Sequence, residues 1–305
     1  MKIKKQKLDN YMLQTIGQAF QDTKNIFKYK NIISPVSDAE ILFSYLLEIN
    51  KSDIYLNFNR ILTENENMLL NEMVSRRLKN VPIQYITKHQ EFMGIDFLVE
   101  KGVLIPRSET EILVEKIIKI LKKRKIFSNL KIADLGTGTG IIAISIAKFL
   151  KNIDIIYAID ISKKALKIAK SNAKKHKCNN KIVFLFGNMF KAFVEKIELN
   201  SLDVIVSNPP YIVKDDFKVL PSEIKDNEPE IALNGGIDGL RYYREIIEKS
   251  SYYLKKDGFL ALEIGTKQAK KIKAIISQNR RYKRNIETIK DYSGIDRVII
   301  AYRKD

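Results

Sequence analysis

Hydrophobic residues recur at helical spacing through the first part of the chain. From about residue 8 to 86, apolar positions repeat every three to four residues, as in "DAEILFSYLLEINKSDIYLN" and "TENENMLLNEMVSRRLKN". "SDAE" at 37–40 and "TENE" at 63–66 both place a Glu three residues after a Ser or Thr, which is the pattern of a helix-starting capping box. We therefore expect a helical bundle domain over residues 1–86. The alternative is that these helices extend the core of a second domain.

The pattern changes after this helical region. Aromatic and β-branched residues cluster around Gly94 and Gly102, which predicts a short antiparallel hairpin over residues 87–107 that links the two halves of the chain. "IPRSETE", at 105–111, then begins a helix that we expect to run to about residue 124.

Short apolar runs alternate with helical segments in the rest of the chain. The runs are "KIADLG", "IIYAID", "KIVFLFG", "LDVIVSNPP" and "GFLALEIG", and the helical segments include "IIAISIAKFL" and "KKALKIAKSNAKKH". Over residues 108–305 this alternation predicts a doubly wound α/β domain, a mostly parallel sheet with helices on both faces. The last two runs, "IETIKDY" and "RVIIAYR", have no helix between them. We expect them to pair antiparallel, so that the last strand runs against the others.

Composition limits the location and the partners of the protein. The basic amino terminus is not followed by an apolar stretch, and no segment approaches the 18 or so apolar residues of a membrane span, so we expect a cytoplasmic protein. One cysteine and two histidines are too few for a zinc site, so we expect no metal. The net charge of +18 suits a phosphate-bearing partner, yet only 12 of the 54 basic residues are arginine. We attribute the charge mainly to compositional bias and expect no direct nucleic-acid binding.

A glycine-rich turn follows the first run of the second domain. "ADLGTGTG" places glycines at 136, 138 and 140, with Thr137 and Thr139 between them, just before a predicted helix. Gly136, Gly138 and Gly140 let a ligand approach the backbone closely, at a helix end where free N–H groups point outward. The dinucleotide fingerprint would need its third glycine at 141, where an isoleucine stands. Asp134 would repel a pyrophosphate but attract the ammonium group of a bound amino acid.

Two further strand ends complete a cofactor pattern. Asp160 ends the second run, 20 residues beyond Gly140, where a carboxylate can accept hydrogen bonds from both ribose hydroxyls. At the end of the third run, Asn188 can bond the edge of adenine, while Met189 and Phe190 can pack on its face. A ribose and an ammonium group without phosphate describe S-adenosyl-L-methionine, which we expect as the cofactor.

The fourth run ends in "NPPY", residues 208 to 211. Pro209 and Pro210 carry no N–H, and Asn208 is held extended by the proline that follows it. The side-chain oxygen of Asn208 and the carbonyl of Pro209 can therefore accept both hydrogens of a conjugated –NH2 group, with Tyr211 against its flat face. The alternative is an ordinary strand-ending Pro-Pro turn.

This turn suits methyl transfer to an amide or aromatic amine. Such a nitrogen is a poor nucleophile because its lone pair is delocalised. Two acceptors on its hydrogens increase the electron density on the nitrogen and orient its lone pair toward the methyl group. They also stabilise the positive charge that develops on the nitrogen. The alkylated nitrogen is acidic, so no general base is needed before attack.

The chain resembles a known family at these motifs and beyond them. "NPPY" and "DLGTGTG", together with "EFMGIDFLVEKGVLIPRSETE", "EPEIALNGGIDGLRYYREII" and "DYSGIDRVIIA", are similar to the HemK-type glutamine methyltransferases that modify class-1 peptide release factors. The resemblance implies methylation of the glutamine side chain in a Gly-Gly-Gln motif. It also implies cofactor contacts from the glycine turn and from Asp160, Asn188, Met189 and Asn208, a glutamine site at 208–211, and docking of the release factor by the bundle and hairpin.

The chain departs from the family pattern at Ser108, where a second proline is usual, and at Asn188, where Asp is usual; both bear on affinity for the cofactor's adenine. Arg107, Glu109 and Thr110 either start a helix or contact the site. We expect the far wall of the substrate pocket to include Glu228 and the turn at 235–239, whereas Glu263 can simply end the fifth strand.

Three other functions remain open from sequence. A sister enzyme that methylates a glutamine of a ribosomal protein would share both motifs. A methyltransferase acting on exocyclic amines of DNA or RNA bases would need a pocket for a flipped base and a basic recognition domain. A cofactor-binding scaffold without activity is the non-enzymatic alternative.

Overall fold

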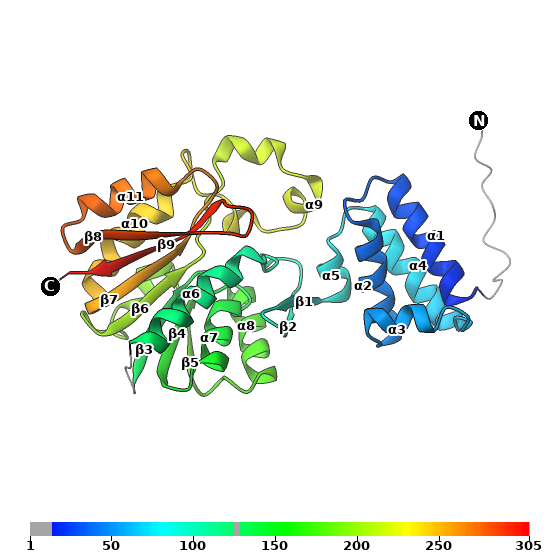
Figure 1. Cartoon of the computed structure of the whole chain (residues 1–305), viewed down its shortest axis with the longest axis horizontal. Helices are drawn as coiled ribbons and strands as arrows, with labels where there is room; N and C mark the ends of the chain where they lie inside the picture. The colour runs from blue at the N-terminus through cyan, green and yellow to red at the C-terminus, as the bar shows by residue number, and fades with distance from the viewer. Residues whose placement is uncertain (1–13, 125–128, 305) are drawn as a thin grey trace. The chain divides into compact units, whose positions relative to one another are not determined.

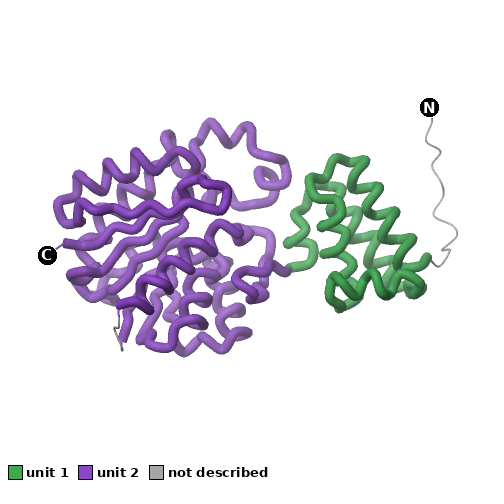
Figure 2. Tube along the Cα trace, in the orientation of Figure 1, with its two compact units in different colours: residues 1–88 green, residues 89–305 purple. Residues whose placement is uncertain are grey.

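A computed structural model describes residues 14–124 and 129–304 of the chain. It divides into two compact units, residues 1–88 and 89–305 (Figure 2). The predicted start of the helical region, at about residue 8, lies outside the described residues. Within the described residues, no helix is both long enough and apolar enough to cross a membrane.

The first unit is helical and has its own core. Its helices are α1 (Ile16–Tyr29), α2 (Pro35–Leu47), α3 (Lys51–Leu56), α4 (Glu64–Leu78) and α5 (Ile83–Thr87) (Figure 1). Phe20 of α1 meets Phe43 of α2 edge to face, with ring centroids 5.4 Å apart. The cluster of buried residues around this pair consists only of residues from this unit. The helices thus bury one another's apolar faces.

The two expected capping boxes have different outcomes. At α4 the expectation is confirmed, because the Thr63 hydroxyl accepts from the Glu66 N–H and the Glu66 carboxylate accepts from the Thr63 N–H. The expectation at 37–40 is wrong. Pro35 occupies the first position of α2, so the helix begins before Ser37 can cap it.

The hairpin comprises β1 (His89–Phe92) and β2 (Ile95–Leu98), which pair antiparallel. Met93 and Gly94 both have positive φ, 52° and 69°, as the tight turn between two strands requires. The hairpin packs as part of the second unit. The Asn172 side chain bonds both the N–H and the carbonyl of Leu98, at 2.8 and 3.0 Å.

The second unit is built on a seven-stranded sheet with the order β5-β4-β3-β6-β7-β9-β8. Its strands are β3 (Leu130–Leu135), β4 (Ile153–Asp160), β5 (Ile182–Phe186), β6 (Leu202–Ser207), β7 (Leu254–Glu263), β8 (Tyr282–Lys290) and β9 (Asp296–Arg303). Strands β3 to β7 pair in parallel, whereas β9 is antiparallel to both neighbours. The predicted doubly wound sheet and its antiparallel last strand are confirmed.

Helices cover both faces of this sheet (Figure 1). They are α6 (Glu109–Lys123), α7 (Ile141–Phe149), α8 (Lys163–Lys175), α10 (Arg241–Tyr253) and α11 (Ala269–Gln278). The short 3-10 turn η1 (Met189–Phe193) follows β5, and the long loop after β6 contains η2 (Lys214–Val219), α9 (Ser222–Lys225) and η3 (Glu230–Ala232).

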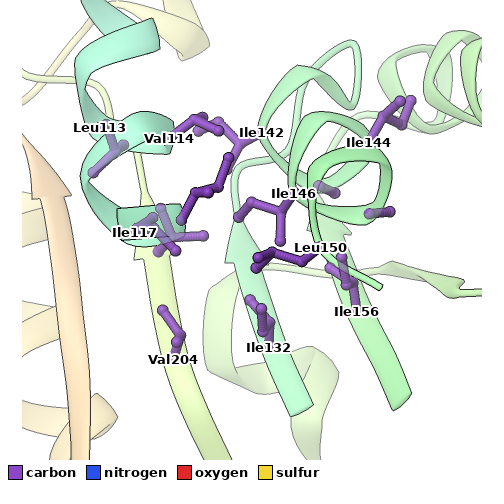
Figure 3. Packing of buried hydrophobic residues seen from close by; sticks show 14 of the residues in the cluster. Leu113, Val114, Ile117, Ile132, Ile142, Ile144, Ile146, Leu150, Ile156 and Val204 are labelled. Carbon is purple, nitrogen blue, oxygen red and sulfur yellow. The ribbon is translucent and has the colours of Figure 1, made fainter. Parts of the chain in front are cut away.

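Successive strand residues face opposite cores, so the sheet is buried on both sides. Val204 of β6 packs with α6 and α7 (Figure 3), and its neighbour Ile205 packs with α10 and α11.

A matched pair of leucines tests the core of the first unit. Leu42 in α2 is fully buried, whereas Leu56 at the end of α3 is 83% exposed. We expect Leu42→Ala to lower the free energy of unfolding of this unit by about 2 to 5 kcal/mol, because it leaves a cavity. Leu56→Ala should change it by less than about 0.5 kcal/mol. Hydrogen exchange of amides in α1, α2 and α4 measures both effects, and equal protection in the two variants would contradict the packing described.

Candidate active site

A cavity of about 850 Å³ opens at the carboxyl ends of the parallel strands, within the second unit. The predicted site residues that line it are Gly136, Thr137, Gly138, Thr139, Asp160, Asn188, Met189, Asn208 and Pro210. The other predicted residues, Asp134, Gly140, Pro209 and Tyr211, are not among its lining residues. The four strand ends singled out from sequence therefore converge on one site.

The glycines of the turn after β3 play different structural roles. All three have positive φ: 74° at Gly136, 59° at Gly138 and 84° at Gly140. A Cβ at Gly136 or Gly138 would meet no atom within 4 Å, so both open toward the cavity. A Cβ at Gly140 would lie 3.0 Å from Ile144 and 3.1 Å from Ala169. Gly136 and Gly138 give a ligand room, whereas Gly140 lets α7 and α8 pack closely.

The sequence suggested that the N–H groups of this turn are free, but three of them are already hydrogen-bonded within the protein. The N–H groups of Gly136 and Thr137 both donate to the Ile159 carbonyl, each at 2.9 Å. The Gly138 N–H donates to Asp160 Oδ2, also at 2.9 Å. The expectation of outward-pointing donors is wrong for these three residues, because the turn is tied to the end of β4. A turn with its donors used in this way suits a ligand without phosphate.

Asp160 lines the cavity and is held in place by the backbone. Its Oδ2 accepts from Gly138, and its Oδ1 accepts from the Ser162 N–H at 2.8 Å. Burial raises the pKa of the carboxyl, and the backbone donors oppose that change. Each carboxylate oxygen retains a second lone pair, so the group can accept from two hydroxyls.

Asp134 lies behind the glycine turn and is fully buried. Its Oδ2 accepts from the Thr137 hydroxyl at 2.6 Å, while its Oδ1 has no hydrogen-bond partner in the described part of the chain. Burial raises the pKa of Asp134 to about 7, and the Asp160 carboxylate adds to this, whereas the Thr137 hydroxyl and the Ala143 N–H lower it. An unpaired carboxylate oxygen at this depth suits a nearby cation.

The segment after β5 is partly as expected. Asn188 and Met189 line the cavity. Phe190 does not; its ring stacks on Tyr253 with centroids 5.7 Å apart, in the core beneath the sheet. The expectation that Phe190 packs on adenine is therefore wrong.

The NPPY turn lies at the carboxyl end of β6, with Asn208 and Pro210 on the cavity. Glycines hold Tyr211 closely: a Cβ at Gly235 would lie 2.7 Å from the Tyr211 Cα, and one at Gly265 would lie 2.8 Å from its ring. Ile212 then pairs with the segment around Asn234. The turn at 235–239 was expected in the far wall of the substrate pocket, and two of its residues, Gly236 and Ile237, line the cavity.

Three long-range contacts at the start of α6 were only partly foreseen. The Arg107 guanidinium, on the cavity wall, donates to Glu228 Oε1 at 2.5 Å, and Glu228 is buried. The Thr110 hydroxyl donates to Glu263 Oε2 at 2.6 Å. Asn208 Nδ2 donates to the Thr110 hydroxyl at 3.2 Å.

Other parts of the cavity wall had no role assigned from the sequence. Leu104, Lys214, Ile231, Arg241 and Tyr242 line it from loops and a helix start. All but Lys214 lie in stretches that resemble the known family, but the resemblance gave none of them a role of its own. No group of three or more His, Cys, Asp or Glu side chains that could hold a metal occurs among the residues described.

Comparisons with known proteins agree with this geometry. Residues 18–87 match the family model "PrmC N-terminal domain", and residues 108–228 match "Methyltransferase small domain". A release factor glutamine methyltransferase of Clostridium acetobutylicum is 39% identical over 290 residues, covering 94% of this chain and 98% of that protein. A release factor glutamine methyltransferase of Thermodesulfovibrio yellowstonii is 40% identical, covering 92% and 98%.

One solved structure supports the fold. A methyltransferase from Pyrococcus furiosus aligns with a TM-score of 0.50 at 20% identity, covering 77% of this chain and all of that one. Together with the match to "Methyltransferase small domain" and with the curated relatives, the sheet order defines a class I methyltransferase that uses S-adenosyl-L-methionine. With relatives this similar over nearly their whole length, the chain belongs to the release factor glutamine methyltransferase family.

The pKa of Asp134 gives a pH prediction for cofactor binding. We expect Asp134 to attract the cofactor's ammonium group in its ionised form, which is lost as pH falls through about 7. We expect the dissociation constant for S-adenosyl-L-methionine to rise several-fold from pH 8 to pH 6, as measured by calorimetry. Asp134→Asn should bind more weakly at pH 8 and depend less on pH. Equal affinity of the unmodified protein at both pH values would count against a role for Asp134.

Proposed function

We propose that this chain transfers the methyl group of S-adenosyl-L-methionine to the side-chain amide nitrogen, N5, of the glutamine in the Gly-Gly-Gln motif of class-1 peptide release factors. The observation that carries the proposal is the position of Asn208 and Pro210 on the same cavity as the glycine turn and Asp160. An acceptor-rich turn thus lies beside a site fitted to this cofactor. Membership of the family supports the choice of substrate.

The cofactor is held by residues from three strand ends. The glycine turn leaves room for the methionine part of the cofactor at Gly136, Thr137, Gly138 and Thr139. Asp134 attracts the ammonium group, and Gly140 supports the turn. Asp160 accepts from the ribose hydroxyls, and Asn188 and Met189 contact adenine. The cofactor supplies a sulfonium-activated methyl group, toward which Asn208 also faces.

The NPPY turn positions the glutamine. The side-chain oxygen of Asn208 and the carbonyl of Pro209 accept the two amide hydrogens, which orients the nitrogen for attack. Pro210 and Tyr211 keep the turn in shape. The same acceptors stabilise positive charge on the nitrogen, and water takes the proton after transfer.

The remaining parts of the chain serve recognition. The helical domain, residues 1–86, and the hairpin, 87–107, dock the release factor onto the methyltransferase domain, 108–305. The protein acts in the cytoplasm and makes no direct contact with nucleic acid.

A labelling assay tests the substrate. With radiolabelled S-adenosyl-L-methionine, we expect methyl incorporation into a release factor that carries Gly-Gly-Gln. A release factor with Gln→Ala at that motif should stay unlabelled, because the accepting amide is missing. Label in ribosomal protein or in RNA, with none in the release factor, would overturn the proposal in favour of one of the other two enzyme classes.

Removal of the Asn208 side chain separates the two roles of the turn. Asn208→Ala should lower kcat by about a hundredfold or more, because one acceptor on the amide hydrogens is lost. Affinity for the cofactor, measured by calorimetry, should change by less than about fivefold. Equal losses in both quantities would mean that the turn serves the cofactor alone.

A further inference from the structure

Three side chains from distant parts of the sequence form a hydrogen-bonded chain beside the cavity. Thr110 lies in the first turn of α6, Glu263 ends β7, and Asn208 follows β6. The Thr110 hydroxyl donates to Glu263 Oε2 at 2.6 Å, and Asn208 Nδ2 donates to the Thr110 oxygen at 3.2 Å. Thr110 is fully buried and Glu263 is 2% exposed, whereas Asn208 reaches the cavity.

This arrangement permits only one orientation of the Asn208 amide. A hydroxyl carries a single hydrogen, and that of Thr110 is committed to the Glu263 carboxylate. The Thr110 oxygen can then only accept, so it must face the NH2 group of Asn208. With the amide reversed, two acceptor oxygens would face each other. The side-chain oxygen of Asn208 is thereby left for a ligand.

We propose that Thr110 and Glu263 are positioning residues that fix the Asn208 amide, so that its oxygen, and not its nitrogen, faces the amide hydrogens of the substrate glutamine. The inference rests on the proposed function. It assigns a purpose to a buried carboxylate that does not line the cavity itself but bonds Thr110, which does.

The surroundings of Glu263 make its charge sensitive to pH. Burial raises its pKa to about 7, assisted by the Glu109 carboxylate of α6; the Thr110 hydroxyl, Arg297 of β9 and the Asn208 amide oppose this. On the remaining sides lie Tyr211 of the turn and Tyr243 of α10, whose hydroxyl donates to the Glu263 carbonyl at 3.0 Å.

Protonation of Glu263 reverses the direction of the chain. A protonated carboxyl can donate to Thr110, whose own hydrogen is then free to donate to the Asn208 oxygen. The amide would turn its NH2 group toward the substrate, which is the unproductive orientation. Ionised Glu263 is the productive form, so turnover is expected to fall as pH drops through about 7.

Substitutions at Thr110 test the positioning role. Turnover of a release factor is measured with saturating cofactor and substrate, so that weaker binding does not affect the result. Thr110→Val keeps the shape but removes the hydroxyl, and we expect kcat to fall by about ten- to a hundredfold with cofactor affinity within about twofold. Thr110→Ser keeps the hydroxyl and should retain kcat within about threefold.

A control separates positioning from loss of stability. Ser250 in α10 also has a buried hydroxyl, which donates to Ile246 and contacts the Tyr282 hydroxyl at 2.6 Å, away from the cavity. Ser250→Ala should leave kcat unchanged below its melting temperature. Equal kcat in Thr110→Val and the unmodified protein, or equal losses in the Val and Ser variants, would overturn the inference.

The pH profile supplies a second, independent readout. Glu263→Gln retains an oxygen that accepts from Thr110 but cannot titrate, so its kcat should be flat between pH 6 and 8. The unmodified protein should lose turnover toward pH 6. A Gln variant with the unmodified profile would also overturn the inference. If the unmodified protein does not label the release factor at all, the proposed function fails instead, and the two failures are thus distinguishable.

Discussion

The parallel pairing of β3 with β4 on one side and β6 on the other is the constraint on which the site depends. Leu135 is level with both Ile159 and Ser207, and the Ser207 hydroxyl donates to the Leu135 carbonyl at 2.7 Å. The residues that follow these three are Gly136, Asp160 and Asn208. Register alone therefore brings the cofactor turn, the ribose acceptor and the substrate turn to one level at the sheet edge.

Local signals were sufficient for these elements because each is encoded within a few residues. A glycine turn with positive φ, an acid at a strand end and two consecutive prolines have a local conformation and chemistry that depend little on the rest of the fold. The wrong predictions concern residues whose conformation or contacts depend on a neighbour. Ser37 does not cap α2 because Pro35 begins the helix, and Phe190 does not reach the cavity because its ring stacks on Tyr253. The N–H groups of the glycine turn are not free because the end of β4 accepts their hydrogen bonds.

Long-range polar contacts were beyond what one sequence can reveal. Thr110 and Glu263 are separated by 153 positions, and neither belongs to a motif that specifies a partner. Only the closure of α6 over the end of β7 makes them neighbours. The same holds for Arg107 and Glu228, which are 121 positions apart. Such pairs follow from tertiary packing, in which any buried carboxylate must find a donor.

The place of β9 in the sheet has a consequence for how the second unit assembles. Strand β8 precedes β9 along the chain yet lies outside it, so β8 joins the sheet through its pairing with β9. The two must join as a hairpin, and the contact with β7 closes a loop of more than thirty residues. Until that step, the edge of β7 is unpaired and exposed to other chains. We expect the pairing of β9 and β8 with this edge to be the slow and aggregation-prone step of folding.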